Sequence, residues 1–154
     1  MIAVQITNRF EKLPVEGTKL KKLVRAICRR FGIAQATVSI GIVDDAEIGR
    51  LNREFLRHEG PTDSLSFDLS DGSGPGEPRV FDLIVNGELA VREAARRGHE
   101  APAELALYVT HGLLHQLGFD DATAGQARRM HRTEDEILHA LGYGSVYNRG
   151  VQAH

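Results

Sequence analysis

The sequence has one cysteine, no tryptophan and no long apolar run. A single thiol, that of Cys28, cannot form an internal disulfide, which is typical of proteins from a reducing compartment. No stretch of about 18 apolar residues is present, so no membrane-spanning helix is expected. Residues 1–5 also lack the charged and apolar regions of a signal peptide. These absences predict a cytoplasmic protein with no membrane partner.

The chain also has little net charge. It carries 19 Lys and Arg against 21 Asp and Glu, a formal charge of −2 at pH 7. This balance argues against a protein that coats nucleic acid, and we expect no DNA partner. A local basic surface is still present on one expected helix. It consists of Lys19, Lys21, Lys22, Arg25, Arg29 and Arg30. We interpret it as a solvated face or, alternatively, as a surface for RNA phosphates.

The length of 154 residues and the apolar fraction of 42% are those of one ordinary globular domain, and we expect residues 1–154 to form it. A chain of this size buries enough surface to fold without a disulfide or a structural metal. Residues 143–154 show no apolar pattern, and we expect them to form a loose tail.

Apolar periodicity predicts four strands and five helices. The strands are expected at residues 2–7, 37–43, 64–69 and 80–85. The helices are expected at 18–31, from Asp44 through Phe55, at 87–97, from about 102 to 117, and from Thr123 to about 141. Asp44, Asn86 and the pair Thr123 and Gln126 are typical helix-starting residues. This order predicts an α+β fold with about five helices packed on a mixed sheet of about four strands.

Asp82 is an unusual residue in its expected strand. The neighbours of this acid in residues 80–85 are almost all apolar. An acid inside such a run is seldom fully buried. We therefore expect Asp82 either at an edge or strand end of the sheet, or in a functional position.

Two histidines four residues apart, on the apolar helix that is expected to be central, give the strongest chemical signal. On a helix, His111 and His115 lie on one face, a turn apart. Gly118 is a natural helix stop because glycine adopts a left-handed conformation without strain. The chain can then turn back and bring Asp120 or Asp121 toward the imidazoles. Two His and one carboxylate with an open fourth position form a catalytic zinc site.

The spacing of these residues is that of metzincin metalloenzymes, with Asp121 where those enzymes usually have a third His. We favour Asp121 as the third ligand, and Asp120 as the rival or as a group that orients a histidine. Gly112 stands where zincin proteases carry the Glu that serves as general base. This difference lowers the expectation of a peptidase.

The segment from His111 to Asp121 resembles the signature H-G-x-L-H-x-x-G-[YF]-D-H of the YbeY family of metal-dependent endoribonucleases. Three further parts of the chain are similar to that family, so that the likeness runs from Ile40 to Gly142. These parts are Leu51-Asn52 with Pro61-Thr62-Asp63-Ser64-Leu65-Ser66-Phe67, the strand Asp82-Leu83-Ile84-Val85, and the last helix with Met130, Glu134, Glu136, Ile137, Leu138 and the following Leu141-Gly142.

The resemblance implies a mixed sheet of about four strands with about five helices. It implies one zinc ion held by His111, His115 and Asp121. It also implies cleavage of single-stranded RNA in ribosomal RNA maturation and ribosome quality control, with ribosomal RNA and the ribosomal small subunit as partners. Thr62, Asp63 and Ser66 are candidates for the substrate cleft, although Pro61-Thr62-Asp63 can equally be a plain turn.

Two residues depart from the family pattern. Asp121 replaces a histidine, which keeps three ligands and makes the site more negative by one charge. Leu56 stands where the family places an arginine that is thought to be catalytic. Arg57 can take this role only if the helix has ended by that residue, since a continuing helix would turn it about 100° away. The alternatives are a ribosome-associated metal-binding factor with weak or lost nuclease activity, and a metallohydrolase of another substrate such as a peptide.

Overall fold

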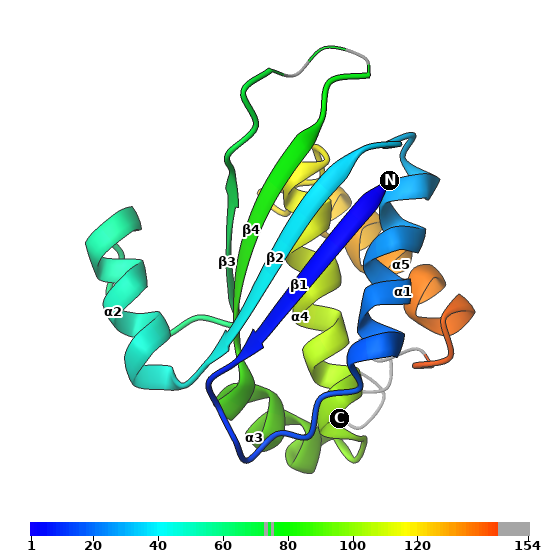
Figure 1. Ribbon diagram of the computed structural model, residues 1–154. Coiled ribbons are helices and arrows are strands. Elements are labelled where there is room, and N and C mark those ends of the chain that lie inside the picture. Colours follow the sequence, from blue (N-terminus) through cyan, green and yellow to red (C-terminus); the bar gives the residue numbers. More distant parts are fainter. Residues whose placement is uncertain (73, 75, 145–154) are drawn as a thin grey trace.

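Figure 1 shows the computed structural model, which describes residues 1–72, 74 and 76–144. Four strands and five helices follow one another in the predicted order, so the predicted α+β fold is confirmed. The strands are β1 (Ile2–Asn8), β2 (Ala36–Val43), β3 (Ser64–Asp68) and β4 (Arg79–Asn86). The helices are α1 (Gly17–Arg30), α2 (Asp45–Leu56), α3 (Gly87–Arg97), α4 (Ala101–Gln116) and α5 (Ala124–Ala140). The loose tail expected at residues 143–154 is wrong for Tyr143, which is buried in the main core and whose N–H donates to Leu138 O at 2.8 Å. Residues 145–154 lie outside the described part.

The four strands form one mixed sheet in the order β1-β2-β4-β3. β2 pairs with β1 and β4 in parallel, and β3 pairs with β4 in antiparallel orientation. β4 is therefore an internal strand, and Asp82 lies in its middle, between Ser39 of β2 and Phe67 of β3. The interpretation of Asp82 as an edge or strand-end residue is wrong. Partial burial raises the pKa of its carboxyl.

The helices cover the two faces of the sheet unequally. α1, α4 and α5 lie on one face, whereas α2 projects from the other (Figure 1). Alternation along β4 explains this division, because Phe81, Leu83 and Val85 point into the main core while Ile84 points to the opposite face. Ile48 of α2 is buried on that opposite face in a small separate cluster. Within residues 1–72, 74 and 76–144, no helix is long and apolar enough to cross a membrane.

Side-chain caps fix where three helices begin. The side chains of Asp44, Asn86 and Thr123 accept hydrogen bonds from backbone N–H groups in the first turns of α2, α3 and α5. For α5 the reciprocal bond from Thr123 N–H to Gln126 is also present at 3.0 Å. These caps were predicted from the sequence, and they are confirmed.

Gly87, the first residue of α3, provides a test of the packing between α3 and the sheet. A Cβ at this position would lie 2.8 Å from Cγ2 of Ile42 and 3.0 Å from a ring carbon of Phe10. We expect Gly87→Ala to lower the free energy of unfolding by about 1–3 kcal/mol, because overpacking a buried contact forces its neighbours apart. Urea denaturation measures the change. Gly125→Ala in the exposed first turn of α5 is the matched control, and equal stabilities of the two variants would contradict this packing.

Candidate metal centre

α4 carries the two histidines and lies in the middle of the molecule. Nearly all of its residues from Ala103 to Leu114 are buried, and it packs on β3, β4 and three other helices. Gly112 permits a close approach to the sheet, since a Cβ there would lie 3.2 Å from Cδ2 of Leu83. His111 and His115 lie outside this contact and are partly exposed. The helix is therefore held firmly by its apolar side while its histidines remain accessible.

The two imidazoles present their Nε2 atoms to the same point. These atoms are 3.2 Å apart, and the rings meet edge to face at 87°. Two nitrogens that each lie about 2.05 Å from a tetrahedral zinc ion are about 3.3 Å apart. The spacing of His111 and His115 thus fits two ligands of one ion.

A glycine turn brings the acidic ligand back to the histidines. Gly118 has φ 99°. Its N–H donates to His115 O, and the N–H of Phe119 donates to Leu114 O at 3.0 Å, which is the bonding pattern of a Schellman motif. The ring of Phe119 packs edge-on against Phe31 with a centroid distance of 5.6 Å. The predicted helix stop is confirmed, and the aromatic contact anchors the loop that follows it.

Asp121, and not Asp120, joins the histidines. One ligand atom from each of His111, His115 and Asp121 lies within 4.8 Å of the other two. Asp120 is turned to the backbone, where its Oδ1 accepts the N–H of Asp121 at 2.7 Å. Two imidazole nitrogens and a carboxylate oxygen are suitable ligands for zinc. This group could hold a metal ion.

A buried carboxylate orients the first histidine. Glu134 of α5 is fully buried. Its carboxylate accepts one hydrogen bond from Nδ1 of His111 at 2.8 Å and another from Nδ1 of His131 at 2.7 Å. With its proton on Nδ1, His111 keeps the lone pair of Nε2 for a metal. This arrangement selects the tautomer that a metal ligand needs.

The pKa values of this pair follow from their contact. Burial alone lowers the pKa of His111, but the hydrogen bond and charge of Glu134, with smaller contributions from Asp63 and Asp121, raise it overall. Burial alone raises the pKa of Glu134, but its hydrogen bonds from His111 and His131 lower it overall. Glu134 is therefore ionised near neutral pH and holds its two imidazoles as a hydrogen-bond acceptor.

A cavity of about 160 Å³ adjoins His111. One helical face each of α3, α4 and α5 contributes to its wall. The lining residues are Asp63, Leu89, Glu93, Arg97, Glu104, Leu107, Tyr108, His111, His131 and Glu134. The wall is thus mostly polar, and it includes one arginine.

The three candidate substrate residues take different places. Asp63 lines the cavity beside His111, and its Oδ1 accepts a hydrogen bond from the hydroxyl of Ser64 at 3.3 Å. The backbone oxygen of Thr62 accepts from the buried Asn86. The hydroxyl of Ser66 accepts from Gln116 of α4 at 2.9 Å. The described contacts therefore place Asp63 at the cavity, whereas Thr62 and Ser66 connect their segment to the rest of the fold.

Arg57 meets the geometric condition set by the sequence, because α2 ends at Leu56. Arg57 has φ 56° and caps the helix, and its N–H donates to Arg53 O at 3.2 Å. Leu56 is 43% exposed. Among the described residues, no hydrogen bond or ion pair joins the side chain of Arg57 to the metal centre. Its role as a catalytic residue stays a prediction.

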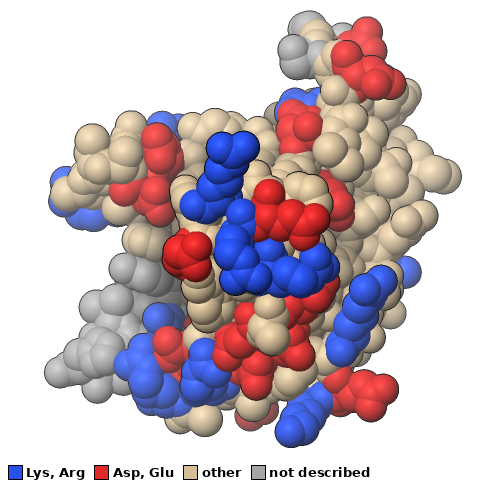
Figure 2. Space-filling view, turned by 90° about the vertical axis from the view of Figure 1, so that its left-hand side faces the viewer, with Lys and Arg blue, Asp and Glu red and all other residues tan. Residues whose placement is uncertain are grey.

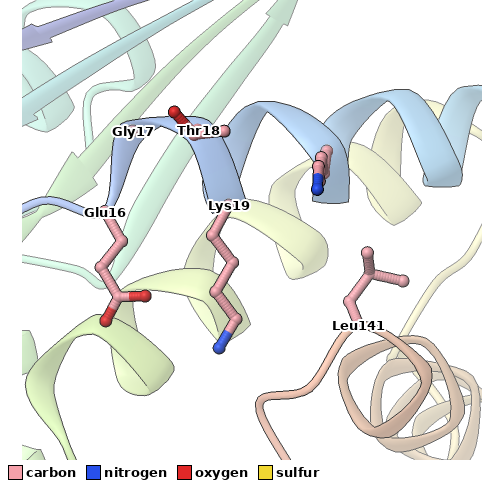
Figure 3. A pocket seen from close by; sticks show the side chains of 6 residues that line it. Glu16, Gly17, Thr18, Lys19 and Leu141 are labelled. Carbon is pink, nitrogen blue, oxygen red and sulfur yellow. The ribbon is translucent and has the colours of Figure 1, made fainter.

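The basic residues of α1 serve partly to attach this helix to its neighbours. Nζ of Lys19 donates to Gly142 O at 3.2 Å, Arg25 donates to Ile2 O, and Arg30 pairs with Glu136. Figure 3 shows Lys19 at a cavity of about 510 Å³ between the start of α1 and Leu141. None of the metal-centre residues lines this cavity. The α1 surface is thus separate from the histidine cavity.

Sequence reasoning missed three residues of the site. Glu134 was noticed only within a family resemblance, and no role was assigned to His131 or Arg97. A signal was nevertheless present, since His131 and Glu134 are three residues apart on one helical face, and Leu89, Glu93 and Arg97 are spaced by four. What the sequence did not show was that these faces converge on His111.

The two adjacent acids of the loop give a direct test of the third ligand. We expect Asp121→Asn to lower zinc affinity by more than about 100-fold, because loss of a partner outside the ligand set alone costs about 10–100-fold. Asp120→Asn should bind zinc as the parent does, since an amide oxygen still accepts the N–H of Asp121. Competition with a chromophoric chelator measures both affinities. A greater loss in Asp120→Asn would reverse the assignment.

Glu134 gives a second test, of the orientation of His111. An amide in Glu134→Gln has only one acceptor atom for two imidazole donors, so we expect zinc affinity to fall by about 10–100-fold. Glu136→Gln removes an exposed carboxylate from the same helix and is the control. The same chelator competition applies, and equal affinities of the two variants would show that Glu134 does not orient the ligand.

Comparison with known proteins gives a consistent result. A family model described as Endoribonuclease YbeY matches residues 5–142. A relative with this name from Anaeromyxobacter sp. (strain Fw109-5) is 40% identical over 153 residues, which are 99% of this chain and 79% of the relative. A relative with the same name from Moorella thermoacetica is 38% identical, over 89% of this chain and 96% of its own.

A solved structure agrees in fold. The solution structure of TM1509 from Thermotoga maritima superimposes with a TM-score of 0.57 over 91% of both chains, at 24% sequence identity. At this identity the likeness supports the fold alone. The family model and the relatives cover nearly the whole chain, metal-centre residues included. The chain belongs to the YbeY family.

Proposed function

We propose that this protein is a zinc-dependent endoribonuclease that cleaves single-stranded RNA. The observation that carries the proposal is the convergence of His111, His115 and Asp121 within 4.8 Å, beside an open cavity. The names of the family relatives support RNA as the substrate. Two imidazoles with one carboxylate favour zinc over the hard cations magnesium and calcium, which prefer oxygen ligands.

Each residue of the proposed active site has a separate role. The three ligands hold the ion, and Glu134 fixes the ring of His111 so that its Nε2 faces that ion. When bound, zinc supplies a Lewis acid that polarises a phosphoryl oxygen. Asp63 presents a carboxylate from the cavity wall toward the substrate side. The buried faces of α4 and α5 keep these groups at fixed distances, which is what catalysis by positioning requires.

The peptidase alternative is disfavoured by the packing of Gly112. In zincin proteases the residue at this position is the glutamate that serves as general base. Here the position faces Leu83 and Ser66 of the sheet. A glutamate in its place would be directed into the core and away from the open side of the site. The helix is therefore packed in a way that leaves no place for that base.

The alternative of a binding factor with weak nuclease activity depends on Leu56. This residue has no charge with which to stabilise a pentacoordinate phosphate. The cavity beside His111 nevertheless contains a guanidinium from another helix. A charge-stabilising group is thus available near the metal centre, which favours an active nuclease.

We infer ribosomal RNA precursors and the small ribosomal subunit as the partners, with roles in RNA maturation and ribosome quality control. The charge distribution is compatible with local recognition. Figure 2 shows a face on which Lys and Arg side chains alternate with Asp and Glu. On α2, for instance, Arg50 pairs with Glu47 and Glu54 at 2.7 Å. Binding then depends on the site and on RNA shape more than on a wide basic surface.

Cleavage of labelled RNA tests the proposal. We expect purified protein to cut a single-stranded ribosomal RNA fragment internally, to lose this activity with a chelator, and to recover it with one equivalent of zinc. A duplex of the same sequence should be cut much more slowly, because its backbone does not bend into a small site. Fragment lengths on a denaturing gel provide the measurement.

The double variant His111→Ala/His115→Ala is the control for contaminating nucleases. Equal cleavage by this variant would contradict the proposal. Absence of cleavage by the parent, together with zinc binding and co-sedimentation with small subunits, would favour the binding factor. Zinc-dependent cleavage of a peptide library in place of RNA would favour the peptidase.

A further inference from the structure

We propose that Arg97 binds a phosphate oxygen of the RNA beside the metal centre and supplies the cation that Leu56 does not. The proposal rests on the nuclease function above. Arg97 lies in the last turn of α3 and lines the same cavity as His111. The inference assigns a phosphate subsite to this cavity.

Arg97 faces the cavity because of the periodicity of α3. Leu89, Glu93 and Arg97 follow one another at intervals of four, so they lie along one face of the helix. All three line the cavity. The side chain of Arg97 is only 21% exposed. Arg96, its neighbour, is 50% exposed and pairs with Glu93. The two adjacent arginines therefore have different surroundings, and only Arg97 faces inward.

The guanidinium of Arg97 has donors without acceptors. Its Nε and Nη1 atoms are buried and make no hydrogen bond. The approach of Nη1 to Oε1 of Glu104 is 3.7 Å, which is too long for a hydrogen bond. Leaving buried donors of a charged group without acceptors is unfavourable. A ligand oxygen in the cavity would remove this cost.

The carboxylates near Arg97 also bind other side chains. Glu93 accepts from Nε of Arg96 at 2.5 Å. Oε2 of Glu104 contacts Nε2 of the buried His99 at 2.5 Å. Glu134 holds two histidines. Oε1 of Glu104 remains as an ion-pair partner of Nη1 of Arg97 at 3.7 Å, while Nε and Nη1 of Arg97 make no hydrogen bond and can donate to an incoming anion.

The chemistry of Arg97 suits the phosphate part of RNA. A planar guanidinium grips phosphate oxygens with two parallel hydrogen bonds. Of the three metal ligands, His111 lines this cavity, so a phosphate held by Arg97 lies beside that ligand.

The general role of arginine at a helix end does not explain this placement. A cation in the last turn interacts favourably with the helix dipole, but it does so from the surface. Arg96 already occupies the exposed position of that turn. Burial of a second guanidinium with two unbonded donors is unfavourable for stability. The ion pair with the buried Glu104 offsets part of this cost, and a ligand-binding role accounts for the two unbonded donors and the nearness to His111.

The test compares Arg97→Gln with two matched variants, Arg92→Gln on the same helix and Arg57→Gln on α2. We expect Arg97→Gln to lower kcat/KM for RNA cleavage by about 100- to 1000-fold, the usual effect of losing one charge-stabilising donor. Arg92→Gln should retain parental activity. A second readout is affinity for a 2′-O-methyl RNA that cannot be cleaved, which Arg97→Gln should weaken about tenfold. Zinc content should be unchanged in all three.

Two further variants keep the test valid if Arg97→Gln folds poorly. Arg97→Lys keeps the positive charge but lacks the two parallel donors of a guanidinium. We therefore expect a kcat/KM between those of the parent and Arg97→Gln, with parental thermal stability. In Arg97→Ala, added guanidinium ion at low concentration should restore part of the activity.

Parental RNA affinity and cleavage in well-folded Arg97→Gln would overturn the proposal. A large loss in Arg57→Gln alone would also overturn it and would return the role to Arg57. If the parent binds zinc but neither cleaves nor binds RNA, the nuclease function fails, and the phosphate subsite fails with it.

Discussion

The buried carboxylate of Glu134 is the contact on which the rest of the site depends. An ionised group with no exposure to solvent is stable only when its oxygens are hydrogen-bonded. His111 of α4 and His131 of α5 supply these bonds, and the bond from His111 connects α4 to α5 by charge as well as by apolar packing. The same bonds fix the tautomer of His111. The requirement to satisfy one buried charge thus also prepares the metal ligand, and stability and function depend on the same contact.

Local signals in the sequence were sufficient for much of the fold and for the ligand set. The interval of four between His111 and His115 fixes a common face wherever a helix forms. Gly118 permits the left-handed turn that returns the chain to the histidines. The caps at Asp44, Asn86 and Thr123 likewise act over three residues or fewer. Backbone geometry thus predicts the common face and the returning turn, and apolar periodicity predicts the order of elements. Geometry alone left Asp120 and Asp121 open, and the metzincin spacing with the family resemblance favoured Asp121.

The remaining features depend on contacts between residues distant in sequence. Asp82 was expected either at an edge or strand end of the sheet, or in a functional position, because the strand order was unknown. The pairing of β4 with both β2 and β3 makes its strand internal. Glu134 is 23 residues from His111, and only the packing of α5 on α4 brings them to 2.8 Å. Arg97 received no role from the sequence, where it only marks the end of the helix expected at 87–97. Only the convergence of three helices shows that it faces a cavity.

The position of Arg97 shows that a cation needed near a phosphate can come from a part of the chain outside the motif that usually supplies it. Charge on a phosphate in the transition state is stabilised by any cation that lies close enough and is already oriented. The position of that cation in the sequence does not affect how well it stabilises this charge. The exposed end of α2, where Arg57 caps the helix, holds a side chain less firmly than a buried wall does. A guanidinium enclosed by α3 and α4 loses little further freedom on binding and interacts through a medium of lower dielectric. Loss of an arginine from the α2 motif is therefore compatible with a functional site, provided that another helix places the charge on the same phosphate.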